Sequence, residues 1–158
     1  MSGMWKTRAA LNWLNLSTPL GLAVARVARC PVERGPQGLR LARDYPWNFP
    51  SGGAFTIGSV ILSRPGLTVE NDPELLAHES RHAGQYAACL GLPFLPLYGL
   101  CAAYSFWRTG SPALANPFER AAGLEAQDLT GMTYNPLTKA YSLGRDVDVN
   151  YILATRRG

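Results

Sequence analysis

The chain has 158 residues, a length that suits one domain with a hydrophobic core of its own. Its net charge of +4 is mild and its basic residues are scattered, so no nucleic-acid partner is predicted. The three cysteines, Cys30, Cys89 and Cys101, are an odd number in apolar surroundings. This is typical of buried thiols in a reducing compartment, although one pairing stays open.

The N-terminal part of the chain predicts two helices. Residues 4–16 have a helical pattern, and a second short helix follows over residues 19–28, with Pro19 at the first helical position, where its missing N–H is harmless. Trp5 and Trp13 either pack on the core or lie on a membrane surface. Peripheral membrane contact through apolar helices therefore stays open.

Two apolar stretches bear on export and on membrane insertion. Residues 9–28 follow Lys6 and Arg8, but polar residues and a proline interrupt the run, whereas a secretory signal needs an unbroken apolar centre. Residues 83–107 carry no charge and are long enough to span a bilayer, but a glycine and two prolines break them in two. We expect a cytoplasmic protein, with membrane association left open.

Two strands are expected next along the chain. Residues 39–43 alternate between apolar and basic side chains, and residues 54–62 are rich in β-branched and aromatic residues. These two strands are expected to pair as a hairpin. Residues 30–38, rich in proline and glycine, indicate a connection with turns.

A helix is predicted over residues 73–90. Asp72 is a good N-cap, and Pro73 and Glu74 suit the first turn, where no N–H is needed and negative charge is favoured. Apolar residues then recur every three to four positions, and Gly91 ends the pattern.

This helix carries the only two histidines of the chain, His78 and His82, in the pattern HExxH. Positions i and i+4 lie on one helix face, where two imidazoles can share a metal ion. Glu79 lies about 100° further round the helix, where a carboxylate can accept a proton from metal-bound water. A pair of surface or hydrogen-bonded histidines is the alternative, and a metal-free helical protein with a chance motif would follow from it.

A catalytic zinc ion normally takes three protein ligands, so a third must come from elsewhere. The longer pattern HExxHxxGxxH is absent, and Cys89 lies about 10 Å along the helix from His82, too far to reach the same ion. A carboxylate from another element remains. Glu119 is the best candidate, with Glu125 and Asp128 as rivals further along the chain.

Glu119 also has a purely structural interpretation. A second apolar helix is expected over residues 94–107, and a third begins with Asn116 as N-cap and Pro117 at its first position. Asn116 and Glu119 have the spacing of a capping box, in which the glutamate bonds back to the N-cap N–H. Spacing alone leaves both roles open.

The residues named so far resemble the compact gluzincins, most closely the small bacterial zincin-like domains that read HExxHxxQ followed by NxxExxA. The resemblance covers residues 53–124, with the first pattern over residues 78–85 and the second over residues 116–122. It implies Zn²⁺ held by His78, His82 and Glu119, with Glu79 as the catalytic base.

Several features depart from that family. Ser80 and Arg81 stand where many active peptidases carry apolar or small residues. No residue is marked as the oxyanion-stabilising group, for which the candidates are Tyr86, Tyr98, Tyr104, Tyr134 and Tyr141. Some compact gluzincins are latent, which makes residues 131–158 a candidate for a segment lying in the cleft.

The sequence therefore predicts an α+β, zincin-like fold, mainly helical, with a small β-hairpin or sheet ahead of the HExxH helix. One domain is expected over residues 1–158, with N-terminal helices over 1–30, a metal-site core over 39–128 and an irregular tail over 131–158.

The predicted function is that of a zinc-dependent, peptidase-like hydrolase acting on a peptide or protein substrate. In this hypothesis Glu79 takes a proton from metal-bound water as the water attacks a carbonyl group. The alternative is a catalytically inactive, metal-stabilised zincin module that acts in membrane association or in protein complex formation.

Overall fold

The structure is a computed structural model that describes residues 3–50, 53–123, 132–135, 140–143 and 147–148. The chain forms two compact units, Met1–Pro96 and Leu97–Gly158, and each is described by itself. The prediction of one domain is left open by this division.

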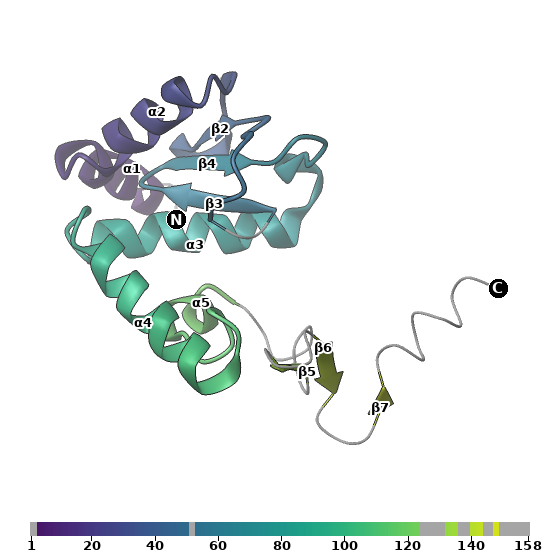
Figure 1. Ribbon diagram of the computed structural model, residues 1–158. Helices are drawn as coiled ribbons and strands as arrows, with labels where there is room; N and C mark the ends of the chain where they lie inside the picture. Colours follow the sequence, from purple (N-terminus) through teal and green to yellow (C-terminus); the bar gives the residue numbers. More distant parts are fainter. Residues whose placement is uncertain (1–2, 51–52, 124–131, 136–139, 144–146, 149–158) are drawn as a thin grey trace. The chain divides into compact units, whose positions relative to one another are not determined.

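The first unit combines helices with a small sheet (Figure 1). Its helices are α1 (Met4–Leu14), α2 (Ser17–Val27) and α3 (Pro73–Ala88), with short 3₁₀ turns η1 (Pro36–Gly38) and η2 (Val69–Asn71). Its strands are β1 (Val32–Arg34), β2 (Arg40–Ala42), β3 (Ala54–Ile57) and β4 (Val60–Ser63). The predicted helices at the N-terminus and at the histidine motif are confirmed, and whether the fold is zincin-like stays a prediction.

The four strands form one mixed sheet in the order β1-β2-β4-β3. β1 pairs with β2 and β3 pairs with β4 in antiparallel fashion, whereas β2 and β4 are parallel, with Arg40 opposite Val60. The predicted hairpin between residues 39–43 and 54–62 is therefore wrong. Residues 54–62 instead fold back on themselves, and β1 lies in the segment predicted as a connection.

Gly58 explains why the expected long strand is split. It has φ +62°, a left-handed conformation that a glycine adopts without steric cost. A Cβ at this position would lie 2.4 Å from the backbone carbon of Ser17, at the start of α2. The tight turn therefore brings the sheet against α2, and only a glycine fits there.

Helices cover both faces of the sheet, with α2 and α3 on opposite sides (Figure 1). Because side chains alternate along a strand, Val60 and Leu62 of β4 pack with Ala25 of α2, while Ile61 packs with Ala83 of α3. All four residues of β4 are buried. A strand covered on both faces reads as a continuous apolar run, as this one does.

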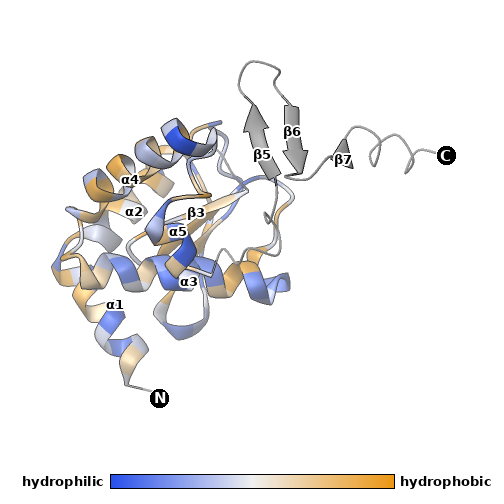
Figure 2. Ribbon diagram, turned by 90° about the horizontal axis from the view of Figure 1, so that it is seen from below, coloured by the Kyte–Doolittle hydropathy of each residue, from blue (hydrophilic) through white to orange (hydrophobic). Residues whose placement is uncertain are grey.

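The ends of α3 follow the predicted signals closely. Asp72 accepts a hydrogen bond from the Leu75 N–H at 3.0 Å, and Pro73 occupies the first turn. At the other end the Gly91 N–H donates to the Tyr86 carbonyl at 2.7 Å, while Leu90 takes φ +59°. This is the hydrogen bond of a Schellman motif, which ends the helix two residues before the predicted position. Figure 2 shows hydrophilic and hydrophobic stretches alternating along α3.

The second unit holds most of α4 (Phe94–Thr109), the short helix α5 (Pro117–Ala121) and a three-stranded sheet. Its strands are β5 (Met132–Asn135), β6 (Ala140–Leu143) and β7 (Val147–Asp148), paired antiparallel in that order. The tail over residues 131–158 is predicted to be irregular, whereas its described residues form these three short strands. Among the described residues, none of the helices has the length and apolar character needed to cross a membrane.

Candidate metal centre

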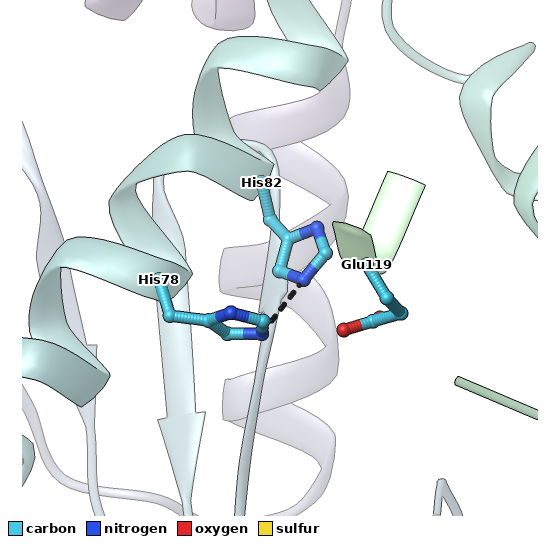
Figure 3. Close-up of side chains that lie close together, drawn as sticks. All are labelled: His78, His82 and Glu119. Carbon is cyan, nitrogen blue, oxygen red and sulfur yellow. Dashed lines mark hydrogen bonds between the residues drawn. The ribbon is translucent and has the colours of Figure 1, made fainter. Parts of the chain in front are cut away.

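His78 and His82 lie side by side on α3, one turn apart. Their Nε2 atoms are 3.1 Å apart, and the two ring planes are nearly perpendicular, at 87° (Figure 3). His82 is buried and His78 is half-buried. The helix thus turns the same nitrogen of both rings toward one point, as the HExxH spacing predicts.

Gln85 holds the other side of the His82 ring. The His82 Nδ1 atom lies 2.9 Å from the Gln85 Oε1 atom, one helical turn further along α3. An amide oxygen can only accept, so a hydrogen bond at this contact requires the proton on Nδ1. In a neutral ring such a bond leaves Nε2 with its lone pair, on the side of His78.

The pair fits a zinc ion. A tetrahedral ion with Zn–N bonds of about 2.0–2.1 Å holds two ligand nitrogens about 3.3 Å apart, close to the separation found. Metal-binding histidines usually donate their second N–H to an oxygen, and the Gln85 oxygen lies where it can accept such a bond from His82. Two of the three ligands expected of a zinc site are therefore arranged within α3 alone.

Glu79 points toward the sheet rather than to solvent. Its carboxylate is buried and accepts a hydrogen bond of 2.6 Å from the Thr56 hydroxyl on β3. The same hydroxyl oxygen lies 3.2 Å from the Glu79 carbonyl, which places it beside the backbone of α3. The predicted base is thus held between the histidine helix and an edge strand.

Helix α1 supports α3 through two polar side chains. The Arg8 guanidinium donates to the Ser80 hydroxyl at 2.8 Å, and the fully buried Asn12 donates to the Ala83 carbonyl at 2.9 Å. Burial lowers the pKa of Arg8 from its ordinary value. On α3 itself, burial raises the pKa of Tyr86, so this phenol stays protonated at neutral pH.

Glu119 belongs to the second unit, in the short helix α5. Asn116 caps this helix by accepting from the Phe118 N–H at 3.0 Å, and Pro117 opens it, as predicted. The Glu119 carboxylate is buried and accepts a hydrogen bond from the Tyr98 hydroxyl on α4. Because the relative positions of the two units are not determined, Glu119 stays the predicted third ligand.

The capping-box interpretation of Glu119 is weakened by its surroundings. In a capping box the glutamate would accept a hydrogen bond from the Asn116 N–H. That N–H instead donates to the Ala113 carbonyl at 3.0 Å.

The rival ligands Glu125 and Asp128 lie outside the described residues. Cys89 is the C-cap residue of α3, seven positions beyond His82.

The sequence left five tyrosines open as the oxyanion-stabilising group of the predicted hydrolase. Of the three whose side chains the structure describes, Tyr98 donates a hydrogen bond from its hydroxyl to a predicted ligand, Glu119. Tyr86 is buried in the first unit, and Tyr104 is exposed and bonds Arg108 at 2.9 Å. The side chains of Tyr134 and Tyr141 lie outside the described part of the chain.

The chain was also compared with known proteins. No family model matches it, and no solved structure matches it. A segment of 46 residues, 29% of this chain, is 63% identical to ubiquinone biosynthesis O-methyltransferase of Thiobacillus denitrificans and covers 20% of that protein. The protein of the same name from Marinobacter nauticus is 70% identical over 37 residues, 23% of this chain and 16% of the relative.

A third such methyltransferase, from Nitrosospira multiformis, is 56% identical over 45 residues, 28% of this chain and 19% of the relative. The chain therefore spans about a fifth or less of the length of the relatives it matches.

These names correct the predicted identity. The relatives are named for O-methyl transfer in ubiquinone biosynthesis, so the gluzincin resemblance and the function of a zinc-dependent peptidase-like hydrolase are wrong. The alternative of an inactive zincin module in membrane association or complex formation has no support either. The suggestion that residues 131–158 lie in a peptidase cleft falls with that function.

The error has a physical reason. HExxH spacing determines how two histidines and a glutamate lie on one helix, and α3 shows that arrangement. The same arrangement suits any chemistry that uses a metal or a hydrogen-bonded histidine pair. A pattern of five residues therefore predicts local geometry, but it does not specify the reaction.

Proposed function

We propose that the chain has a methyltransferase-related function, in the transfer of a methyl group to a hydroxyl oxygen during ubiquinone biosynthesis. The supporting observation is the 63% identity over 46 residues to a protein named for that reaction. Similar segments of two further relatives, at 70% and 56% identity, add to this support.

We propose further that His78, His82 and Glu119 bind one Zn²⁺ ion. The converging Nε2 atoms, the hydrogen bond from His82 to Gln85 and the buried carboxylate of Glu119 support this ligand set. When bound, the ion would supply a positive charge that lowers the pKa of a coordinated hydroxyl group. Glu79, next to His78 on α3, is the residue proposed to accept the proton.

A methyl-transfer assay tests the first proposal. The purified chain is incubated with S-adenosylmethionine and a soluble phenol that has two adjacent hydroxyl groups, and the product is identified by mass spectrometry. A second arm adds the full-length Thiobacillus denitrificans methyltransferase. We expect an O-methylated product from the chain alone or a changed rate in the second arm. No product alone together with an unchanged rate would contradict the proposal.

Elemental analysis of the dialysed protein tests the second. We expect about one zinc ion per wild-type chain, consistent with a single site of three protein ligands. Glu119→Ala should lose most of it, because two histidines alone leave the ion with too few protein ligands. Glu74→Ala is the matched control, since this glutamate is exposed in the first turn of α3. Zinc retained in full by Glu119→Ala would rule out that residue as a ligand.

A further inference from the structure

Gln85 is a polar residue of the candidate metal centre for which the sequence predicts no role of its own. It lies three residues beyond His82 on α3, so its side chain is on the same helix face. Its Oε1 atom is 2.9 Å from the Nδ1 atom of His82. Both residues belong to the first unit, so this contact is independent of where the second unit lies.

We infer that Gln85 is a positioning residue that fixes His82 in the tautomer with its proton on Nδ1. The amide oxygen has lone pairs and no hydrogen, so it selects the ring form that donates from this nitrogen. His82 then presents an unprotonated Nε2 atom, with its lone pair, to the point where the proposed ion would bind. This inference rests on the proposed zinc site for its purpose, although the tautomer itself can be measured without metal.

The contact between the two rings then determines the state of His78. Their Nε2 atoms are 3.1 Å apart, which is hydrogen-bond distance, and the His82 nitrogen can only accept. The proton must therefore belong to Nε2 of His78. In the metal-free protein the two histidines are thus opposite tautomers, with His78 protonated on Nε2 and His82 on Nδ1.

Binding of a zinc ion by both Nε2 atoms requires one rearrangement. The proton on the His78 Nε2 atom leaves and another is taken up at Nδ1, through solvent, so the number of ring protons is unchanged. His82 needs no such change, because Gln85 already holds its proton on the far side of the ring. Of the two histidines, His82 is therefore the ligand prepared in advance.

Nitrogen-15 NMR of the full chain tests the inference directly. The chain holds only two histidines, so ¹⁵N-histidine labelling gives two ring systems, which His78→Ala assigns. Couplings between ring nitrogens and carbon-bound protons show which nitrogen carries hydrogen. In the metal-free protein we expect His82 protonated on Nδ1 and His78 on Nε2. After zinc is added, both rings should be protonated on Nδ1.

Substitutions at position 85 separate positioning from general structure. Gln85→Leu removes the acceptor and should lower zinc affinity by about 10- to 100-fold, measured by competition with a coloured chelator. Gln85→Glu keeps an oxygen in place and should retain both the His82 tautomer and zinc binding. Ala77→Leu, an added leucine at an exposed position of the same helix, is the matched control.

The outcomes distinguish this inference from the proposed zinc site. A proton on Nε2 of His82 in the metal-free wild type would overturn the inference, as would wild-type zinc affinity in Gln85→Leu. Opposite tautomers without any change on adding zinc would support the role of Gln85 and overturn the zinc site instead.

Discussion

Thr56 shows how a hydroxyl group from the sheet holds Glu79, the proposed proton acceptor of the site. Its side chain is buried on β3 and donates to the Glu79 carboxylate. A hydrogen bond to a charged group contributes about 1.5–3 kcal/mol, more than one between neutral groups. The hydroxyl therefore supplies a donor to the buried carboxyl group and joins α3 to β3 at the same point.

Replacing Thr56 by valine should reveal this contribution. Thr56→Val keeps the branched shape but removes the donor, so we expect a loss of about 1.5–3 kcal/mol in the free energy of unfolding, measured with urea on metal-free protein. Thr56→Ser keeps the hydroxyl and should lose less. Equal stability of the valine variant and the wild type would show that the bond has no net effect.

Tyr98 has the corresponding position beside Glu119. Tyr98→Phe removes one hydroxyl that donates to the predicted ligand, so we expect zinc affinity to fall by up to about 10-fold with the fold unchanged. Tyr104→Phe removes a hydroxyl from the same helix, where it is exposed and bonded to Arg108, and should leave affinity unchanged. Chelator competition on both variants measures the difference, and equal losses would contradict the assignment.

At the residue scale, the sequence predicts the residues of the HExxH motif but not the side chains that hydrogen-bond to the site. His78, Glu79 and His82 follow from spacing along one helix. Gln85 is also within reach of that reasoning, because position i+3 lies on the same face as His82. Thr56 and Tyr98 come from other elements, and their contacts arise only when those elements pack.

Among the elements, the hairpin of β3 and β4 depends on a single turn residue. Gly58 takes φ +62° and approaches the backbone at Ser17. Gly84, in contrast, lies inside α3 with open space around its Cα, since a Cβ there would meet nothing within 4 Å. Substitution by alanine at the two glycines should therefore have opposite effects on the stability of the protein.

We expect Gly58→Ala to destabilise the protein by at least about 1–2 kcal/mol from its backbone conformation alone, with a further cost from the clash with α2. Gly84→Ala should stabilise it by about 0.5–1 kcal/mol, because alanine favours a helix. Thermal unfolding of both variants measures this. A tolerated Gly58→Ala would mean that the turn does not require glycine.

The elements were predictable to the extent that their signals are local. Asp72, Pro73 and the apolar spacing give α3 to within two residues at its end. The partner of β2 could not be obtained in this way, because its parallel pairing with β4 is non-local and is set by α2 and α3 packing on opposite faces. The strands β5 to β7 have no strong periodicity in the sequence.

At the scale of the whole molecule, the proposed ligands come from both units. Zinc bound to folded protein should raise the free energy of unfolding by about 2.7 kcal/mol at a free concentration 100 times its dissociation constant. We expect a zinc-dependent rise in the melting temperature of the wild type and a much smaller one in Glu119→Ala. An equal rise in both would place the ion on the histidines without Glu119.

Asn12 connects the beginning of the chain to the helix that carries both histidines. Its buried amide group donates to Ser59 at 3.2 Å and to the carbonyl of Ala83, the residue after His82. Trimming the chain past this asparagine, for example to obtain a shorter form for crystallisation, would strip a donor from the centre of α3. A usable shortened form must therefore keep α1, although that helix contributes no ligand.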